Sequence, residues 1–568
     1  APTGILPEDD FDRQPWRIGT LTVVAAARLD DRSALLAKLG IGPCEGESMA
    51  DSDIVARACA RWGTEVPRHL YGEWALAMWD SAERRLFAAV DHFGCVRLYF
   101  HRQGHVLHLA TQLAALMTHP DVRPEIDPRL LGLHVAPRVV LGTTMFREIE
   151  HLPGGSSLTW REGKLSIRPW WQPDVTTSPR FRNDDDYVEE AKALFDSAVT
   201  ARLRTSGGIV AALSGGLDSP LVAATAAGRM AGPLPVYTSV PEPGLALEER
   251  PFWDSDDWPF AAAVAAMYPN MVHRRVAPDG QAAIDLFPEI HRSSRTPARN
   301  ATNQVWYLRI VREAQAQGAR VILGGDRGNV SLTVDGGFGP RDRARISYYR
   351  FQMNRLGRRL RDPESWRPRI GATAGANPPI WARDAEGLRA GSGLLSTQFR
   401  AAHREELRPL GSADPHSGFL KFATMPEKVP SPDLMALAGC EWRDPMRDRR
   451  LVEALITYPF AVFRAGGRTR GLARAVARGR LPDIVRLRTR RGAQAPDAAA
   501  WFEAHEPRYR AAFAIVRASP IANEILDMAR VEQVLDLLCA GDRTQDCYSL
   551  HRALDAGMFA SAFEAGQW

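Results

Sequence analysis

The sequence has little cysteine, no long apolar run and almost no net charge. Six cysteines occur in 568 residues and none belongs to a C-x-x-C pair, which excludes a disulfide scaffold and a zinc ribbon. No stretch of about 18 apolar residues is present, so we expect no membrane-spanning helix and no membrane partner. The segment Ala1–Asp10 is acidic and contains proline, unlike a secretory signal. We therefore expect reduced thiols and a cytoplasmic location.

Composition and charge are those of an ordinary globular chain. Hydrophobic residues make up 45% and charged residues 24%, which excludes a disordered, collagen-like or coiled-coil protein. The net charge of +5, from 72 basic and 67 acidic residues, does not require nucleic acid, and we expect no such partner. Arginine clusters in residues 341–361 and 443–491, where a solvated surface is the default interpretation of any single arginine. The length predicts two to four domains.

The first region has the pattern of a β-rich, α+β domain. Runs of strand length are separated by short polar turns, which is hairpin spacing. They cover Thr20–Arg28, Gly72–Asp80, Arg85–Asp91, Val96–Arg102 and His105–Ala110. A helix is predicted over Asp51–Arg61, where apolar residues recur at helical spacing. We place this domain at residues 1–170, and Pro169–Asn183, which lacks periodicity, is the best linker candidate.

From residue 184 onward, strand-like and helix-like segments alternate. A helix is predicted over Tyr187–Leu203, with capping residues before it. Strands are expected at Gly208–Leu213, Val236–Val240, Val272–Val276 and Arg320–Gly324, and helices at Leu221–Met230, Pro259–Met267 and Gln304–Gln317. This alternation predicts a parallel sheet with helices on both faces, in an α/β domain over residues 184–568. Beyond about residue 340 we expect mainly helix.

The most specific signal is the loop between the first of these strands and its helix. It consists of Ser214, Gly215, Gly216, Leu217, Asp218 and Ser219. The glycines permit a tight turn that aims backbone N–H groups at one point, and the helix N-terminus adds its positive dipole end. The serines add hydroxyl donors, and Asp218 is the expected Mg²⁺ ligand. We predict a phosphate-binding loop; the alternative is a plain strand-to-helix turn.

The loop is not of the Walker type, because G-x-x-x-x-G-K-[ST] and its lysine are absent. Ser214–Ser219 matches the pyrophosphate-loop signature of N-type ATP pyrophosphatases, and the chain around it resembles the asparagine synthetase family over most of its length. The other segments that carry this resemblance are Tyr71–Asp80, Asp91–Tyr99, Glu441–Asp448, and Leu481–Val485 followed by Arg488, Arg490 and Arg491. The first two look like later strands of that family's class II glutamine amidotransferase domain. The last two resemble its E-x-R-x-P-F-L-D and L-P-E-E-V…R-x-K segments.

The resemblance implies an α/β protein: an N-terminal α+β, class II glutamine amidotransferase-like domain and a C-terminal parallel-sheet ATP pyrophosphatase domain with added helices. It also implies a site for ATP and Mg²⁺ at the C-terminal ends of the parallel strands. The residues that it assigns to the nucleotide are Ser214–Ser219, Thr238, Ser239, Gly324 and Gly325. Asp218 and Asp326 would be metal ligands, and Arg490, Asp326 and Glu441 are carried over as catalytic residues. A cation at Arg490 would stabilise charge on the α-phosphate or the tetrahedral intermediate.

Three departures from the family pattern bear on function. The chain begins Ala1-Pro2-Thr3, has no cysteine before Cys44 and lacks an Asn-Gly-Glu motif, so we expect an inactive glutaminase, which would need an N-terminal cysteine. Asn329 stands where the family motif G-x-G-x-D-E has its aspartate, and Asp326 is the nearby carboxylate that would substitute, or else a turn cap. Arg490 replaces a lysine, which keeps the charge and adds a bidentate fork; the alternative is a surface arginine.

Asparagine synthetase-like chains without a working glutaminase include β-lactam synthetases and lasso peptide cyclases. The segments Gly325–Asn329, Asp444–Glu453, Gly466–Arg470 and Arg488–Gly492 look most like those of lasso cyclases. This resemblance implies adenylation of an Asp or Glu side chain in a leader-cleaved core peptide. The peptide's N-terminal amine would then attack the adenylate, giving a macrolactam ring, AMP and pyrophosphate. A leader peptidase and a leader-binding protein would be partners.

Other interpretations stay open at this point. The chain would alternatively be a β-lactam synthetase-like or an ammonia-dependent asparagine synthetase-like amide ligase. A tRNA-modifying ligase or thiolase of the pyrophosphatase fold would use the basic C-terminal region on RNA phosphates, although the amidotransferase-like first region speaks against it. A catalytically inactive scaffold is the non-enzymatic alternative, and the intact loop at Ser214–Ser219 argues against that.

Overall fold

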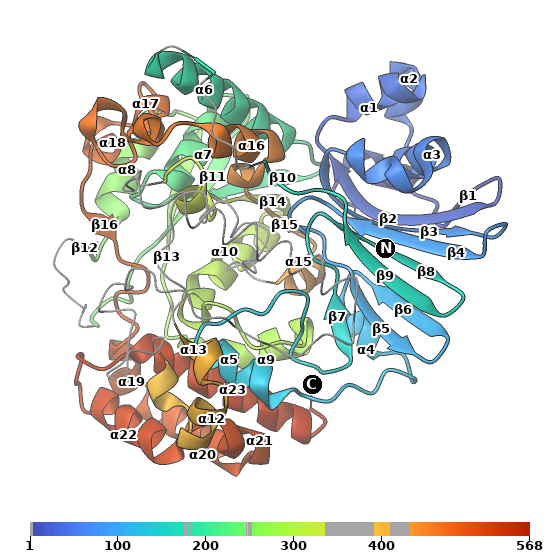
Figure 1. Ribbon diagram of the computed structural model, residues 1–568. Coiled ribbons are helices and arrows are strands. Elements are labelled where there is room, and N and C mark those ends of the chain that lie inside the picture. Colours follow the sequence, from blue (N-terminus) through green and yellow to red (C-terminus); the bar gives the residue numbers. More distant parts are fainter. Residues whose placement is uncertain are drawn as a thin grey trace.

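The structure, a computed structural model, describes residues 4–174, 180–181, 183–245, 247, 253–334, 391–408 and 431–567. The arginine cluster at 341–361 and part of the expected linker at 169–183 lie outside the described residues. Figure 1 shows the β-rich N-terminal region, in blue, beside a larger region of sheet and helices, in green to red. None of the helices in the described ranges has the length and apolarity needed to cross a bilayer.

The N-terminal region is built on two antiparallel sheets. The larger has the order β1-β2-β3-β4-β8-β9 and the smaller β6-β5-β7. The strands are β1 (Trp16–Ile18), β2 (Leu21–Leu29), β3 (Gly72–Asp80), β4 (Arg85–Val90), β5 (Tyr99–Gln103), β6 (Val106–Ala110), β7 (Ile149–His151), β8 (Ser156–Arg161) and β9 (Lys164–Pro169). One apolar cluster lies between α3 (Asp51–Trp62) and the larger sheet, and a second lies between the two sheets. Strands of the larger sheet contribute side chains to both clusters, because successive side chains of a strand point to opposite faces.

The predicted strand Val96–Arg102 begins late, at Tyr99. The cause is the buried carboxylate of Asp91, which accepts hydrogen bonds from the backbone N–H groups of Phe93, Cys95 and Val96. These donors therefore do not join a sheet ladder. The helix and the other strands predicted in this region are confirmed to within a residue or two.

The second region contains a parallel five-stranded sheet of order β13-β11-β10-β14-β15. Its strands are β10 (Gly208–Ala212), β11 (Leu234–Ser239), β13 (Met271–Val276), β14 (Ala319–Leu323) and β15 (Glu441–Arg443). The chain builds outward from β10 through β11 to β13 and then returns to place β14 on the other side of β10. The order therefore reverses between β10 and β14, and ligands of open α/β sheets bind at such a switch point, beyond the carboxyl ends of the strands.

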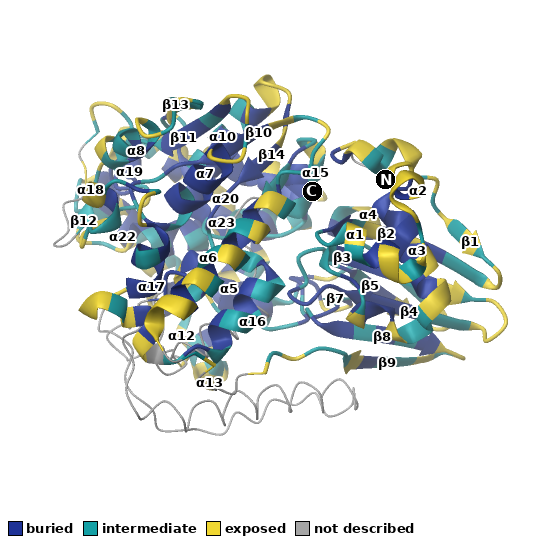
Figure 2. Cartoon of the chain, turned by 90° about the horizontal axis from the view of Figure 1, so that it is seen from above, coloured by how far each residue is buried: buried dark blue, intermediate teal, exposed yellow. Residues whose placement is uncertain are grey.

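Helices cover both faces of this sheet, as the strand–helix alternation predicted. On one face an apolar cluster joins the sheet to α6 (Asp184–Ala201), α7 (Asp218–Ala227), α8 (Trp258–Ala265), α16 (Arg449–Thr457) and α17 (Gly471–Val476). On the other face α10 (Gln304–Ala316) and α15 (Pro432–Leu437) pack against it. Figure 2 shows that buried residues concentrate in the strands and in α7 and α10, while α6 and α12 (Thr397–Ala402) carry exposed outer faces.

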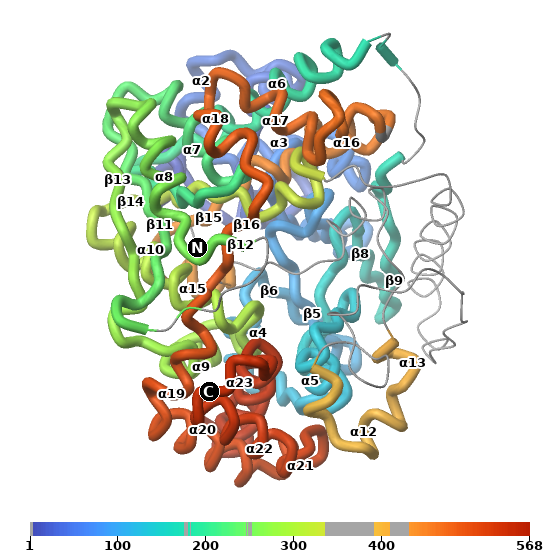
Figure 3. The backbone as a smooth tube through the Cα atoms, turned by 90° about the vertical axis from the view of Figure 1, so that its left-hand side faces the viewer, coloured from blue at the N-terminus to red at the C-terminus, as the bar shows by residue number. Residues whose placement is uncertain are grey.

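The expectation of mainly helix beyond residue 340 is confirmed for the described residues, which also include two short strands. The region contains β15 and a short strand, β16 (Arg491–Gly492), which pairs in parallel with β12 (Trp253–Asp254). Strands of two or three residues are too short to show a period, and their partners lie far away in the sequence. Figure 3 shows the orange segment with β16 running beside the green segment with β12 and α8.

A helical layer completes the molecule. One large apolar cluster is formed by α9 (Ala283–Ser294), α20 (Glu506–Ala518), α22 (Met528–Cys539) and α23 (Cys547–Glu564) together with α5 (Pro128–Val135). Since α5 comes from the first 170 residues, the two regions share this core. The domain boundaries at 170 and 184 stay predictions.

A buried ionic network also links the regions. The Arg202 guanidinium, at the end of α6, lies 3.6 Å from Glu73 and 3.5 Å from Asp30 on one side and 3.3 Å from Asp448 on the other. Arg28 pairs with Asp30 and lies 3.0 Å from Glu73. Burial alone would raise the pKa of Glu73, but the charges of Arg28 and Arg202 lower it to about 2. The carboxylate therefore remains ionised at neutral pH.

Candidate active site

A cavity of about 630 Å³ lies at the carboxyl ends of β10, β11 and β14. Its position is the switch point of the parallel sheet, and its volume falls in the range of ligand sites. The cavity brings together nearly every residue that the sequence assigned to a site: Ser214–Ser219, Thr238, Ser239, Gly324, Gly325, Asp326 and Arg490. Glu441 lies elsewhere.

The loop between β10 and α7 is tied together by its own side chains. The Ser219 Oγ accepts the Ser214 backbone N–H at 3.0 Å, and the Ser214 Oγ accepts the Gly216 N–H at 3.2 Å. The two serine oxygens lie 3.0 Å apart, with Ser219 donating to Ser214. The hydroxyls thus fix the loop conformation, which differs from the expectation that both simply point at a ligand. A preformed loop loses less conformational entropy when it binds phosphate.

Glycine is required at Gly215 in the loop and at Gly325 beside it, because other groups approach these positions closely. A Cβ on Gly215 would lie 2.5 Å from Arg488 Nη1 and 2.7 Å from Asp257 Oδ1. A Cβ on Gly325 would lie 2.7 Å from the Asp218 carbonyl carbon and 2.8 Å from the Ser219 nitrogen. The segment after β14 therefore packs directly on the start of α7, backbone against backbone.

Arg488 holds the loop from outside. Its Nη1 donates to the Gly215 carbonyl oxygen at 2.8 Å and to Asp257 Oδ1 at 3.0 Å. Its Nε and Nη2 donate to Asp254 Oδ2 at 2.9 and 2.6 Å, and the guanidinium lies over the Phe260 ring. Only 6% of the Arg488 side chain is exposed. This is a fixed, charge-assisted clamp on the loop.

Arg490 lies at the rim of the same cluster. Its Nε donates to Asp254 and its Nη2 to the Trp253 carbonyl oxygen, while 52% of the side chain remains exposed. Burial opposes ionisation of Asp254, but hydrogen bonds from Arg488 and Arg490 outweigh it and lower the pKa of that carboxyl. Asp254 therefore holds both arginines in place, and Arg490 faces the cavity from an ordered position.

Asp326 is held by two aromatic donors. The Tyr307 hydroxyl donates to its Oδ1, and Trp442 Nε1 donates to its Oδ2 at 2.9 Å. Asp218 is fixed separately, because the Thr333 hydroxyl donates to its Oδ1 at 2.5 Å. Burial and the charge of Asp326 raise the pKa of a third carboxyl, Asp444, to about 7. Asp444 lies inside the Glu441–Asp448 segment that carried the resemblance, but sequence reasoning did not single it out.

These groups fit ATP and Mg²⁺. A glycine loop whose N–H groups meet a helix N-terminus suits phosphate oxygens, and Asp218 and Asp326 supply the hard oxygen ligands that Mg²⁺ prefers. The fit rests on the chemistry of the donor set, because the loop of Ser214–Ser219 and the carboxylates of Asp218 and Asp326 line one cavity. When bound, Mg²⁺ would neutralise charge on the phosphates and on departing pyrophosphate.

The side chain of Thr238 bonds to other parts of the protein and does not serve as a ligand contact. Its buried hydroxyl donates to the Leu213 carbonyl oxygen at 2.6 Å and lies 2.7 Å from His273 Nε2. Burial, with a smaller effect of Arg275, lowers the pKa of His273 to about 4. The neutral imidazole and the hydroxyl join β10, β11 and β13, so the part of Thr238 left for a nucleoside is its backbone.

Glu441 is not brought to the cavity. It begins β15 and therefore lies at the amino end of that strand, opposite the carboxyl ends that frame the site. Its carboxylate pairs with the Nε and Nη2 of Arg443, and Arg443 Nη1 donates to the carbonyl oxygens of Arg202 and Arg204. This geometry gives Glu441 a structural ion pair outside the cavity, and its catalytic role stays a prediction.

Sequence reasoning missed the residues that position the site, namely Arg488, Asp254, Asp257, Tyr307, Trp442 and Asp444. Arg488 stands in the R-x-R pattern after Leu481–Val485. The motif therefore included it, but the role in the site was assigned to Arg490. Asn329 does line the cavity, where its Oδ1 accepts a hydrogen bond from Arg470 at 2.8 Å.

Comparison with known proteins agrees with this geometry. A parallel sheet with a lysine-free phosphate loop at its switch point, and carboxylates beside it, is the arrangement of a nucleotide-dependent enzyme. Residues 190–562 match the asparagine synthase family and residues 13–171 match a glutamine amidotransferase domain. The chain belongs to the asparagine synthase family. It is thus an ATP-dependent, AMP-forming carbon–nitrogen ligase with a glutamine amidotransferase-like N-terminal domain.

Individual relatives are distant. Asparagine synthetase [glutamine-hydrolyzing] 3 of Bacillus subtilis is 24% identical over 499 residues, which is 84% of this chain and 76% of that protein. A putative asparagine synthetase of Mycobacterium tuberculosis is 30% identical over 184 residues, covering 31% of this chain and 28% of that protein. A Bacillus subtilis glutamine phosphoribosylpyrophosphate amidotransferase structure overlaps 42% of this chain and 50% of its own at 13% identity, with a TM-score of 0.20. That overlap is too slight to support an argument.

Proposed function

We propose that this ligase is a lasso peptide cyclase, which joins a side-chain carboxylate of a leader-cleaved core peptide to the peptide's own N-terminal amine. The observation that carries the proposal is the composition of the cavity wall beyond the phosphate loop. That wall is rich in aromatic side chains: Trp306, Tyr307, Trp442, Trp501 and Tyr548. Large aromatic surfaces suit the varied side chains and backbone of a peptide.

The replacement at Asn329 supports the same choice. Asn329 stands where the family motif has an aspartate, and its amide oxygen accepts from Arg470 across the cavity lining. A neutral amide there leaves one fewer negative charge beside the incoming carboxylate. Free aspartate, with two carboxylates and an ammonium group, would instead need several charged partners at fixed positions.

Different residues of the site act in adenylation and in amide formation. The peptide carboxylate attacks the α-phosphate of ATP, and the N–H groups of the loop at Ser214–Ser219 receive the departing pyrophosphate. Arg490, fixed by Asp254, stabilises negative charge as the amine attacks the acyl-adenylate, the acyl–phosphate bond breaks and AMP leaves. The aromatic wall excludes water from that adenylate. Holding amine and acyl carbon together supplies about 7–11 kcal/mol of barrier lowering.

A second candidate is an asparagine synthetase-like ligase that takes free ammonia and a small amino acid. It is favoured by the names of the relatives, which are asparagine synthetases. A β-lactam synthetase-like reaction, in which a small substrate closes on itself, is the third possibility. Neither small substrate would engage the far aromatic wall of the cavity.

ATP–pyrophosphate exchange separates these functions. We expect exchange with glycine-initiated peptides that carry one Asp or Glu, and mass spectrometry should show a product lighter by one water. The matched peptide with Asn or Gln should give no exchange. A peptide with an acetylated N-terminus should support exchange but form no ring. Exchange with aspartate and ammonium alone, and with none of the peptides, would overturn the proposal.

The expected partners follow from the same proposal. A core peptide with a free amine requires a peptidase that removes its leader, and a leader-binding protein would deliver the precursor to that peptidase. Co-expression of this chain with candidate precursor genes, with and without a peptidase, tests the order of steps: ring formation should require leader removal.

A further inference from the structure

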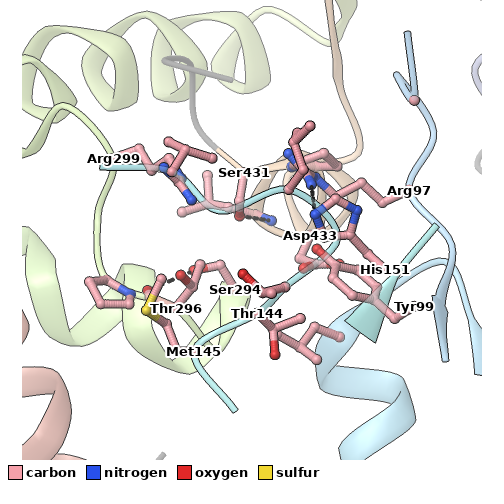
Figure 4. Close-up of a pocket in the computed structure, with 18 of the residues that line it drawn as sticks. Arg97, Tyr99, Thr144, Met145, His151, Ser294, Thr296, Arg299, Ser431 and Asp433 are labelled. Carbon is pink, nitrogen blue, oxygen red and sulfur yellow. Dashed lines mark hydrogen bonds between the residues drawn. The ribbon is translucent and has the colours of Figure 1, made fainter. Parts of the chain in front are cut away.

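A second, smaller cavity lies where the two regions of the chain meet. It measures about 120 Å³ and shares no lining residue with the nucleotide cavity. Figure 4 shows side chains entering it from both regions, with Arg97, Tyr99 and His151 on one side and Ser294, Thr296 and Arg299 on the other. A single water needs about 10–15 Å³ of such volume, so the space suits a ligand of several heavy atoms.

Three arginines line this space, Arg97, Arg299 and Arg447. Within the described ranges Arg97 and Arg299 have no carboxylate at ion-pair distance. The nearest polar neighbour of Arg97 is His151, whose Nε2 lies 3.4 Å from Arg97 Nη1. Burial, and then the charge of Arg97, lowers the pKa of His151 to about 3, so the imidazole is neutral. Burial, and then the charge of Arg97, also lowers the pKa of Arg299 to about 9. The two arginines thus repel each other across the pocket.

The nearest carboxyl does not neutralise them. Asp433 lines the same cavity and is 4% exposed, and its Oδ1 has no hydrogen-bond partner in the described part of the chain. Burial raises the pKa of Asp433 to about 7, with an opposing effect of Arg97. The pocket therefore carries an excess of positive charge at neutral pH, which is costly in a buried site without a counter-ion.

Hydroxyl donors complete the lining. The Ser431 Oγ accepts the Leu434 N–H at 3.2 Å and keeps its own proton to donate. Thr296 also lines the pocket, close to Ser294, whose hydroxyl donates to the Ile290 carbonyl oxygen at 2.6 Å. Guanidinium N–H donors and the Ser431 hydroxyl around one small, partly open space are the recognition elements of a carboxylate or phosphate group.

We propose that this interdomain pocket binds a small oxyanion, held between Arg97 and Arg299. Because Arg97 belongs to the amidotransferase-like region and Arg299 to the synthase region, the bound anion would join the two. The segment that carries Arg299 continues into Asn300, Thr302 and Asn303, which line the nucleotide cavity. The proposal does not depend on which amide the ligase makes.

Titration calorimetry with two probes, inorganic phosphate and malonate, tests the site. We expect one saturable site, with the better probe identifying phosphate or carboxylate as the preferred anion. Arg299→Gln and Arg97→Gln should each weaken binding at least about tenfold, since hydrogen bonds to charged groups are among the strong ones. Arg292→Gln, which alters an exposed arginine of α9, is the matched control and should bind like the unchanged protein.

The phosphate-binding loop is a competing location for either probe. Gly215→Ala obstructs that loop, so binding that survives in this variant and is lost in Arg299→Gln supports the interdomain site. Arg299→Lys keeps the charge and loses the fork, and serves if the glutamine variant fails to fold. Absence of saturable binding of both probes would overturn the proposal. So would binding that is lost in Gly215→Ala and unchanged in both arginine variants.

Discussion

Arg488 Nη1 donates a hydrogen bond of 2.8 Å to the carbonyl oxygen of Gly215, 273 residues earlier in the chain. The same nitrogen also donates to Asp257, and the rest of the guanidinium binds Asp254. The conformation of the phosphate loop is therefore set partly by a segment that follows the last strand of the sheet, β15, in the sequence. The backbone N–H groups of the loop are therefore oriented before a ligand binds.

Replacing Arg488 by lysine should slow the first half-reaction without unfolding the protein. Lysine cannot bind Gly215, Asp254 and Asp257 together, because it has one compact ammonium group in place of a fork. We expect ATP–pyrophosphate exchange to fall about 10- to 100-fold, the equivalent of one or two charge-assisted hydrogen bonds. Arg478→Lys, at an exposed arginine of the same region, is the control. Equal activities of the two variants would contradict the clamp.

A methyl group at Gly328 should displace Asp218, the carboxylate expected to bind Mg²⁺. A Cβ there would overlap the Asp218 carboxylate, and overpacking of this kind costs about 1–3 kcal/mol. We expect exchange activity to fall at least about 100-fold, as misplacement of a reacting group by an ångström can do. Gly232→Ala is the matched control, because no atom lies within 4 Å of its added Cβ. Thermal melts of both variants separate misplacement from unfolding.

The Mg²⁺ requirement should depend on Asp218 directly and on Tyr307 indirectly. Asp218→Asn is expected to reduce exchange by about 100-fold or more, because a charged ligand of the phosphate-bound metal is lost. Tyr307→Phe removes the hydroxyl that orients Asp326 and should raise the Mg²⁺ concentration for half-maximal exchange about 10- to 100-fold. Excess chelator should abolish exchange in every variant. A Tyr307→Phe protein with unchanged Mg²⁺ dependence would place the metal away from Asp326.

Arg490 and Glu441 are expected to behave differently, although both were carried over as catalytic residues. Arg490 faces the nucleotide cavity, whereas Glu441 lies at the amino end of β15 beside Arg443. Arg490→Gln should lower the rate of amide formation about 100-fold, measured as AMP release with a competent substrate. Glu441→Gln should alter stability by about 1 kcal/mol and leave turnover nearly unchanged. Normal turnover in Arg490→Gln together with loss of turnover in Glu441→Gln would show that Glu441 acts in catalysis.

The interdomain network should make stability sensitive to acid. The pKa of Glu73 is about 2 in the folded protein against an ordinary 4.5, so its stabilising effect is complete above about pH 5 and is lost as pH falls through that interval. Glu73→Gln should lower the free energy of unfolding at neutral pH by about 3 kcal/mol, because Arg28 and Arg202 lose a partner. Urea unfolding at several pH values measures this.

The unchanged protein and a variant of an exposed carboxylate are the controls for the acid titration. In Glu73→Gln the free energy of unfolding should change less between pH 5 and pH 2 than in the unchanged protein. Glu65→Gln removes an exposed carboxylate paired with Arg68 and should cost no more than about 1 kcal/mol at any pH. If the two variants show the same acid profile, the network does not join the regions energetically.

Sequence reasoning placed the phosphate loop and most of the nucleotide residues in one cavity because their signals are local. Ser214–Ser219 combines glycines, hydroxyls and an acidic residue within six positions, directly between a strand and a helix. The longer strands and helices predicted up to residue 323 were recognisable for the same reason, since each has a hydrophobic pattern within its own length.

The groups that position the site were not predictable in this way. Asp254 acquires its role only when β12 and β16 pair, and Trp442 reaches Asp326 only because β15 joins the sheet edge. The position of Glu441 away from the cavity was not predictable either, because a motif match does not tell which end of a strand faces the ligand. The pairing of residues distant in sequence has no local signature, and short strands show no period.

The edge position of β15 has a consequence for synthesis on the ribosome. When residues 208–323 have emerged, four strands are available, but β14 still presents an open edge until Glu441–Arg443 follows and pairs with it. Unpaired edges invite association with other chains. The nascent protein must therefore carry a four-stranded sheet with one open edge while residues 324–440 are translated, and the contact between Arg488 and the phosphate loop forms only after Arg488 has left the exit tunnel.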